Sequence, residues 1–151
     1  MHRRANFFYR HNCKFIARWI SQRAVKKTGI EIHPAAKLGR RLFIDHGSGV
    51  VIGETTEIGD DVLIYQGVTL GGTGKEIGKR HPTIGNGVMI GSGAKILGPF
   101  HVGDNSLIAA NAVVLDEVPP NSTAVGVPAR IVKRDGKKIE SLDQVHMPDP
   151  L

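Results

Sequence analysis

The stretch VVIGETTEIGDDVLIYQGVTLGG, residues 50–72, places a large aliphatic residue at every sixth position. These residues are Ile52, Ile58, Ile64 and Leu70. A period of six fits neither the 3.6-residue turn of an α-helix nor a simple meander of hairpins. It is typical of a β-helix built from hexapeptide units, in which each unit forms a short strand and a tight corner.

The same period continues on both sides of this stretch. Three units close one coil of such a β-helix, so thirteen units predict about four coils. The sequence therefore predicts a mainly β fold, a parallel β-helix over residues 29–134. The thirteen aliphatic positions are Ile32, Leu38, Ile44, Ile52, Ile58, Ile64, Leu70, Ile84, Ile90, Ile96, Val102, Ile108 and Val114.

Two places break the period. Two extra residues lie between Ile44 and Ile52, in a segment that contains His46-Gly47-Ser48-Gly49. Eight extra residues lie between Leu70 and Ile84, which predicts a loop over residues 71–83. A solenoid accommodates extra residues as outward loops, and these loops often form the binding face. We therefore expect the functional groups at these two breaks.

The segment 1–28 differs from the rest of the chain in its charge. It holds eight Lys and Arg residues and no acid, whereas the remainder holds 12 basic and 14 acidic residues. Because the positive charge is not on the folded domain, nucleic-acid binding is disfavoured. The pattern predicts one amphipathic helix over residues 1–28 that packs on the domain or on a partner subunit. A membrane-surface helix and an organellar transit peptide are the alternatives. The apolar face would contain Phe8, Phe15, Ile16, Trp19 and Ile20.

The composition favours a cytoplasmic protein without a membrane partner. No apolar run is long enough to span a bilayer, and no apolar signal-peptide segment follows the first residue. Cys13 is the only cysteine, which excludes an intramolecular disulfide, and we expect it to be buried. Residues 135–151 are expected to form a C-terminal tail.

The breaks carry groups suited to acid–base chemistry and to carboxylate binding. His46 can accept a proton near neutral pH, and Glu31 and Asp45 are candidate carboxylates to orient it. Arg80, followed by His81, suits a bidentate grip on a carboxylate. A histidine with local hydrogen bonds and a solvated basic loop are the structural alternatives. The segment LGGTGK, residues 70–75, lacks the P-loop pattern, but its amides suit an oxyanion.

Six segments together resemble the serine O-acetyltransferases of the left-handed β-helix hexapeptide transferase superfamily. They are GIEIHPAAKLG, IDHGSGVVIGE, QGVTLGGTGK, KRHPTIG, GSGAKILG and VGVPARIV, and the resemblance covers roughly residues 28–134. It implies a left-handed coil and transfer of acetyl from acetyl-CoA to the hydroxyl of L-serine, a step of cysteine biosynthesis.

The resemblance also implies roles for single residues. His46 corresponds to the general base, and Glu31 stands where the family usually has an aspartate beside that base. Asp45 would lie near the substrate amino group, and Arg80 and His81 would hold its carboxylate. Acetyl-CoA is implied as a co-substrate, with no metal and no tightly bound cofactor. The residues implied to bind it are Gly72, whose N–H would face the oxyanion, and Thr73, Ser92 and Ala110 along the CoA groove.

Partners are implied in the same way. The family works as a trimer with each site between neighbouring prisms, so we expect a homotrimer. The family's long helical domain joins two trimers, and here only residues 1–28 correspond to it, so we do not expect the usual hexamer. In many members a C-terminal isoleucine docks into cysteine synthase, and Leu151 takes that position here.

Three other functions fit the hexapeptide period. An acetyltransferase for another hydroxyl acceptor is disfavoured by Arg80, since a sugar has no carboxylate to bind. A zinc enzyme of the γ-carbonic anhydrase kind needs three histidines at one metal, and only His46 and His81 lie at the breaks. A non-catalytic β-helix trimer is the third alternative.

Overall fold

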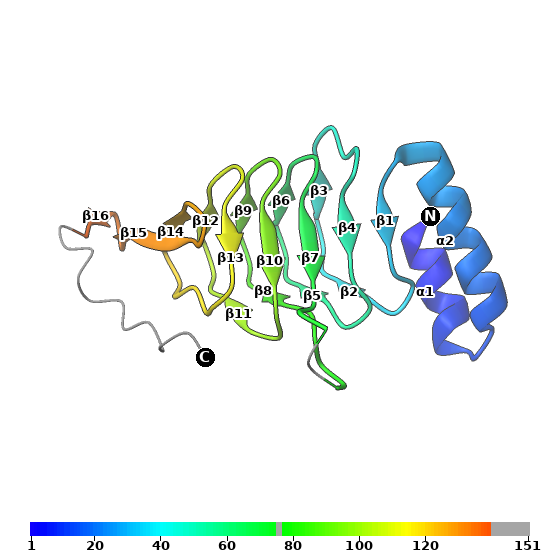
Figure 1. Ribbon diagram of the computed structural model, residues 1–151. Helices are drawn as coiled ribbons and strands as arrows, with labels where there is room; N and C mark the ends of the chain where they lie inside the picture. The colour runs from blue at the N-terminus through cyan, green and yellow to red at the C-terminus, as the bar shows by residue number, and fades with distance from the viewer. Residues whose placement is uncertain (75–76, 140–151) are drawn as a thin grey trace.

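The chain, seen here in a computed structural model that describes residues 1–74 and 77–139, forms a three-sided prism (Figure 1). Each side is a sheet of short strands that pair in parallel from coil to coil. Sheet A contains β1 (Glu31–Ile32), β4 (Val51–Ile52), β7 (Thr69–Gly71), β10 (Lys95–Leu97) and β13 (Val113–Val114). Sheet B contains β2 (Lys37–Leu38), β5 (Glu57–Ile58), β8 (Thr83–Ile84) and β11 (His101–Val102). Sheet C contains β3 (Phe43–Ile44), β6 (Leu63–Ile64), β9 (Met89–Ile90), β12 (Leu107–Ile108), β14 (Ser122–Val125), β15 (Arg130–Arg134) and β16 (Lys137–Lys138).

The fold is the predicted left-handed parallel β-helix, and the strand register confirms both breaks of its period. Along sheet A, Glu31 pairs with Val51, Val51 with Thr69, Thr69 with Lys95, and Lys95 with Val113. The second and the fourth of these steps are equal, and each is three hexapeptide units long. The first and the third steps are longer, because they hold the two and the eight extra residues. A regular coil is therefore three units, as the period predicts.

The core is a column of stacked aliphatic side chains inside the prism. Ten of the thirteen repeat positions are buried, and Ile32, Leu38 and Ile44 of the first coil are partly buried against them. Burial of one such side chain contributes about 1.5–3 kcal/mol relative to its exposure. The stacked core therefore fixes the coils in register and leaves the corners free to carry other residues.

Two helices, α1 (His2–Arg10) and α2 (Lys14–Thr28), cover the open end of the first coil (Figure 1). The sequence predicted one helix here, but the chain turns between them at Asn12. Asn12 has φ 58°, a left-handed conformation that asparagine tolerates better than most residues. The N–H of Cys13 then donates to the carbonyl of Phe8 at 2.9 Å, which closes the turn.

The packed face of the helices matches the predicted one only in part, because Ile20 is buried and Phe8 partly buried, whereas Phe15, Ile16 and Trp19 are exposed. The buried helical residues are Ala5, Ala17, Ile20 and Ser21, whereas the side chains of Phe15 and Trp19 are 85% and 55% exposed. The buried residues are mostly small, and Phe15 and Trp19 face outward, whereas Tyr9 of α1 packs edge-on against the ring of His33. Cys13 is exposed as well, contrary to the expectation of burial. No helix within residues 1–74 and 77–139 has the length and hydropathy to cross a bilayer.

The far end of the prism is closed by a reversal of the chain. β14 pairs in parallel with β12 but antiparallel with β15, and β15 pairs antiparallel with β16. β16 falls within the segment expected to be a tail. Residues 140–151 of that segment, Leu151 included, lie outside the described residues.

The three corners of the prism have different characters. The "histidine corner" joins sheet C to sheet A at residues 45–50, 65–68, 91–94 and 109–112. The "loop corner" joins sheet A to sheet B at residues 33–36, 53–56, 72–82 and 98–100. The "ladder corner" joins sheet B to sheet C at residues 39–42, 59–62, 85–88 and 103–106.

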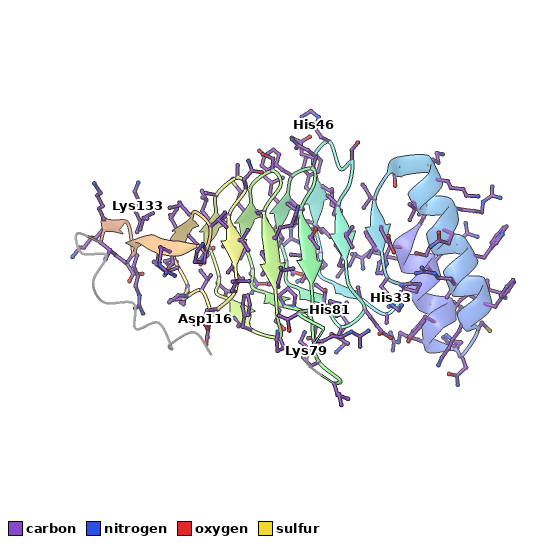
Figure 2. All side chains as sticks on the ribbon, in the orientation of Figure 1. His33, His46, Lys79, His81, Asp116 and Lys133 are labelled. Carbon is purple, nitrogen blue, oxygen red and sulfur yellow. The ribbon has the colours of Figure 1, made fainter. Side chains whose placement is uncertain are left out.

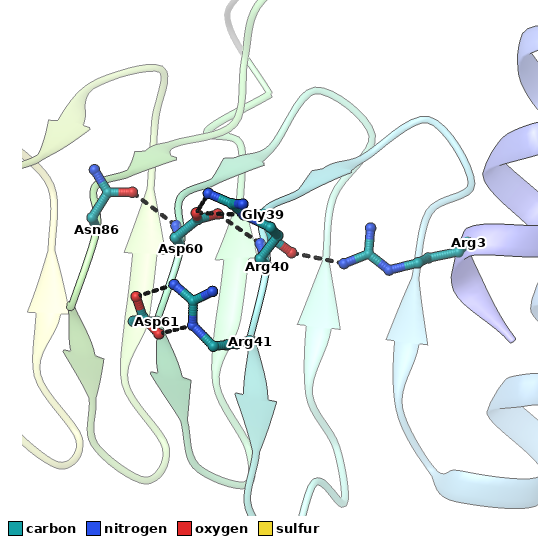
Figure 3. A network of polar contacts seen from close by, with 7 residues as sticks. All are labelled: Arg3, Gly39, Arg40, Arg41, Asp60, Asp61 and Asn86. Atoms are coloured by element: carbon teal, nitrogen blue, oxygen red, sulfur yellow. Dashed lines mark hydrogen bonds and ion pairs between the residues drawn. The ribbon is translucent and has the colours of Figure 1, made fainter.

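The ladder corner repeats the same polar contact from coil to coil (Figure 3). The Asp60 carboxylate accepts the backbone N–H of Arg40 at 2.6 Å, and the Asn86 carbonyl oxygen accepts that of Asp60 at 2.8 Å. Arg41 pairs with Asp61 beside them, and Arg3 of α1 donates to the carbonyl of Gly39 at 2.8 Å. This corner therefore stacks the coils and holds α1 against the first of them.

Candidate functional site

The first break forms a loop at the histidine corner, between β3 and β4. His46, Gly47 and Gly49 have φ values of 59°, 73° and 73°, so the backbone leaves the regular coil here. At Gly47 the positive φ favours glycine, and an added Cβ would also come within 2.5 Å of the Ile30 side chain. The loop presents His46 as an exposed side chain at the edge of the prism (Figure 2). Asp45 directly before it is half-buried.

The loop is tied to the first coil by backbone hydrogen bonds. The N–H of Gly49 donates to the carbonyl of Gly29 at 3.0 Å, and the N–H of Glu31 donates to the carbonyl of Val50 at 2.8 Å. Glu31 therefore lies one coil before the end of the loop. Within the described residues its carboxylate makes no hydrogen bond to His46.

Ser92 and Ala110 lie on the same histidine corner in later coils. The N–H of Asn111 donates to the carbonyl of Ser92 at 2.8 Å, which stacks these two coils directly. A Cβ on Gly91 would come within 2.6 Å of the Ala110 nitrogen. The two predicted CoA-groove residues are thus adjacent, on the corner that carries His46.

The second break forms a loop at the loop corner, between β7 and β8. Its two stems approach closely, since a Cβ on Gly72 would lie 2.8 Å from the carbonyl oxygen of Arg80. Thr73 follows as an exposed residue. Gly72 is therefore near Arg80, and both Gly72 and Thr73 lie on the loop corner, not on the histidine corner of Ser92 and Ala110.

His81 is held tightly where this loop rejoins the coil. Its side chain is buried, and its ring lies over Gly53, where an added Cβ would overlap Cδ2 of the ring. Its Nδ1 accepts the backbone N–H of Thr55 at 3.1 Å and lies 2.9 Å from the Thr55 hydroxyl. Burial, followed by the charge of Arg80, lowers the pKa of His81. The ring is therefore neutral near pH 7 and carries its proton on Nε2.

Arg80 is oriented by a carboxylate that the sequence analysis did not select. Its guanidinium donates to Glu54, whose other oxygen accepts the hydroxyl of Tyr9 at 3.3 Å. The Arg80 hydrogen bond is the main cause that holds the pKa of Glu54 below its usual value. Tyr9 belongs to α1, so the helical pair contacts the same cluster. Because a guanidinium has five N–H donors, Arg80 keeps donors for a further acceptor.

Lys79, Arg80 and His81 all contact the preceding coil. Lys79 donates from Nζ to the carbonyl of Thr55 at 2.6 Å, and burial lowers the pKa of Lys79. Glu54 and Thr55 were missed because their partners come from another coil. Counting residues along the repeat would have found them. The coil that contains the second break is 26 residues long, so it places Glu54 beside Arg80 and Thr55 beside His81.

The structure does not bring all predicted site residues together within one chain. Figure 2 shows His46 at one edge of the prism and Lys79 and His81 at the opposite edge. Asp45, His46, Ser92 and Ala110 lie on the histidine corner, whereas Gly72, Thr73, Arg80 and His81 lie on the loop corner. Both corners flank sheet A. Among the described residues, no group of three His, Cys, Asp or Glu side chains is arranged to hold a metal ion.

Comparisons with known proteins agree with this architecture. Residues 81–116 match the family "Bacterial transferase hexapeptide (six repeats)". The chain is 58% identical over 151 residues to a serine acetyltransferase of Bacillus pumilus, a match that covers 99% of this chain and 70% of that protein.

Two solved structures have the same fold. One is a serine acetyltransferase from Brucella abortus in complex with coenzyme A, with a TM-score of 0.87 and 52% identity. The other is a serine acetyltransferase from Neisseria gonorrhoeae in complex with serine, with a TM-score of 0.84 and 48% identity. The matches cover 88% and 87% of this chain, and the chain spans just over half of those proteins, 53% and 54%.

Proposed function

Because this chain belongs to the serine acetyltransferase family, we propose that it transfers acetyl from acetyl-CoA to the hydroxyl of L-serine. The products are O-acetyl-L-serine, which feeds cysteine biosynthesis, and CoA. The observation that carries the proposal is the pair of donors at the loop corner, the Arg80 guanidinium and Nε2 of a neutral His81. Such a pair suits the carboxylate of an amino-acid acceptor, whereas a sugar acceptor has no carboxylate for it to bind.

The reaction is a direct transfer in which His46 acts as general base. His46 takes the proton of the serine hydroxyl as its oxygen attacks the thioester carbonyl carbon. The backbone N–H of Gly72 stabilises the oxyanion of the tetrahedral intermediate. The C–S bond then breaks, and the CoA thiolate takes the proton from His46. Glu31, whose carboxylate makes no hydrogen bond to His46 in the described part of the single chain, would orient His46 once the site is assembled, and Asp45 would bind the substrate amino group.

The remaining predicted residues bind the co-substrate. Ser92 and Ala110 follow His46 along the histidine corner and line the groove for acetyl-CoA on one side. Gly72 and Thr73 line it from the loop corner. No metal and no tightly bound cofactor takes part in the proposed reaction.

A homotrimer completes the site. The histidine corner and the loop corner flank the same sheet, so three parallel copies with sheet A toward a threefold axis bring the histidine corner of one copy against the loop corner of the next. The loop of the second copy would then lie beside sheet C of the first. Ile77 of the loop and Phe43 of sheet C are both exposed and would be covered by this contact.

The cellular setting follows from the proposed function. We place the protein in the cytoplasm, where acetyl-CoA and L-serine are both available. A complex with cysteine synthase stays a prediction, because Leu151 lies outside the described residues.

Release of free CoA thiol from acetyl-CoA tests the proposed function. L-serine is compared with D-serine, homoserine and a simple sugar, for the wild type and for His46→Ala. We expect release that needs L-serine and that falls by about 10²–10⁴-fold in His46→Ala, the usual contribution of a general base. Transfer to the sugar in place of L-serine would identify another acetyltransferase. A trimer that binds acetyl-CoA but transfers to none of these acceptors would contradict the proposal.

A further inference from the structure

Thr55 contacts all three residues that end the loop. Its carbonyl accepts Lys79 Nζ, and its hydroxyl oxygen accepts the backbone N–H groups of Arg80 and His81, both at 3.1 Å. Its own backbone N–H donates to Nδ1 of His81. Every polar group of this one residue is therefore used to hold the segment that carries the carboxylate-binding side chains.

The direction of these hydrogen bonds determines where the His81 proton lies. Because the Thr55 hydroxyl oxygen already accepts two N–H groups, its own proton is free to point to Nδ1 of His81, 2.9 Å away. The Thr55 N–H approaches the same nitrogen at 3.1 Å. A nitrogen that faces two donors accepts and carries no proton of its own, so the ring proton is on Nε2.

We propose that Thr55 is a positioning residue whose hydroxyl holds His81 as the Nε2–H tautomer and directs it, with Arg80, at the carboxylate of the acceptor. The part that concerns the acceptor rests on the proposed function of Arg80 and His81. The part that concerns the tautomer does not, because it follows from contacts within the chain.

The charges around His81 fit this role. The positive charges of Arg80 and Lys79 disfavour a cationic His81 ring, and His33 has a small effect in the same direction when it is charged. The carboxylate of Glu54 favours the cationic ring. Burial is the largest influence and also favours the neutral ring. Removal of the Thr55 hydroxyl takes away one donor at Nδ1 and leaves the N–H groups of Arg80 and His81 without their acceptor.

Thr56 provides a matched control. It is fully buried, and its hydroxyl has no hydrogen-bond partner among the described residues. Thr56→Val therefore makes the same chemical change one residue away without breaking a hydrogen bond. Thr55→Ser keeps the hydroxyl and removes only a methyl group.

Kinetics test whether the hydroxyl acts on acceptor binding. We expect Thr55→Val to raise KM for L-serine about tenfold, as for loss of a hydrogen bond that orients a charged contact, with KM for acetyl-CoA unchanged. Thr55→Ser should restore the wild-type KM, and Thr56→Val should keep it. Should Thr55→Val not assemble, Thr55→Ala makes the same deletion with less bulk. An unchanged KM in the variant without the hydroxyl would overturn the role in binding.

Nitrogen NMR of the histidine rings tests the tautomer separately. The ring nitrogen signals of His81 are assigned by their disappearance in His81→Asn. In the wild type and in Thr55→Ser, these signals should show an unprotonated Nδ1 and a protonated Nε2. In Thr55→Val we expect the ring to titrate at a higher pH than in the wild type. The same tautomer and titration in Thr55→Val would overturn the proposal. If the wild type does not use L-serine, the proposed function fails, and the NMR comparison still decides the tautomer.

Discussion

The ladder corner and the loop corner both join one coil to the next through side chains, but they do so differently. At the ladder corner, Asp60 and Asn86 cap the backbone of the preceding coil in turn, with Asp60 half-buried and Asn86 exposed (Figure 3). At the loop corner, the contacts of Glu54 with Arg80 and of Thr55 with His81 occur once, and His81 is buried. A contact that repeats with the coils supports stacking, whereas a single contact beside an insertion indicates a site.

The largest difference is expected from the arginines of the two corners. Arg80→Ala should raise KM for L-serine about ten- to a hundredfold, because it removes charge-assisted hydrogen bonds to the carboxylate. Arg41→Ala, which breaks only the exposed pair with Asp61, should leave KM unchanged. Steady-state kinetics of both variants decide this. Equal effects on KM would remove the distinction between the corners.

The glycines of the two corners offer the next comparison. A Cβ on Gly53 would overlap the His81 ring, so Gly53→Ala should displace the ring and raise KM for L-serine. A Cβ on Gly59 would lie 2.6 Å from the Asn86 side-chain oxygen and 2.9 Å from the Gly85 backbone. Gly59→Ala should therefore lower the free energy of unfolding by about 1–3 kcal/mol, as overpacking does, with KM retained. Urea unfolding measures the stability of each variant, and steady-state kinetics measure its KM for L-serine. A raised KM in Gly59→Ala with an unchanged KM in Gly53→Ala would contradict the prediction.

Acid should affect the loop corner before the ladder corner. The pKa of folded His81 lies below its ordinary value of 6.5 through burial, so below that pH the unfolded chain binds a proton that the folded chain does not. Stability therefore falls as the pH falls through this window. Asp60 and Asp61 have pKa values below 3.8, because the hydrogen bonds from Arg40 and Arg41 favour their charged forms, and their contribution persists to lower pH.

Thermal unfolding between about pH 7 and about pH 5 checks the order. His81→Asn should lose less stability over this range than the wild type, while Asp61→Asn should follow the wild-type slope. Part of the slope should remain in both variants, because burial lowers the pKa of His2 to about 4. A shallower slope in Asp61→Asn than in His81→Asn would refute the assignment.

The smallest expected effect contrasts two adjacent threonines. Thr56→Val removes a buried hydroxyl that has no partner among the described residues and keeps the side-chain volume. The free energy of unfolding should rise by about 1 kcal/mol, the cost of a buried unsatisfied hydroxyl. Thr55→Val should lower it, because three hydrogen bonds of the Thr55 hydroxyl are lost. Denaturant unfolding of the two variants measures both changes. A Thr56→Val variant that is less stable than Thr55→Val would contradict the prediction.

Much of the fold could be predicted because the six-residue period reports burial directly. Ten of the thirteen predicted aliphatic positions are buried in the core, the other three are partly buried against it, and both breaks of the period are loops. The break between α1 and α2 was missed because the turn depends on the left-handed conformation of Asn12, which no periodicity reveals. The exposure of Phe15 and Trp19 was missed because the buried side chains of the helices are mostly small ones, Ala5, Ala17 and Ser21, together with Ile20.

The site could be predicted in part. His46, Arg80 and His81 were selected because they lie at the breaks, but Glu54 and Thr55 lie in a regular unit of the repeat. Their roles depend on side-chain contacts across a 26-residue coil. The two breaks lie at different corners because the first follows a strand of sheet C and the second follows a strand of sheet A. This placement is set by the coil and cannot be read from either motif.

The central claim is that one site takes His46 from one copy and Arg80 from the next. Co-assembly of His46→Ala chains with Arg80→Ala chains tests it most directly, because every chain then lacks one of the two groups. Random assembly of equal amounts would leave about one site in four with both groups intact, so we predict recovery of about a quarter of the wild-type CoA release. Mixed trimers no more active than the separate variants would contradict the claim and place the whole site within a single chain.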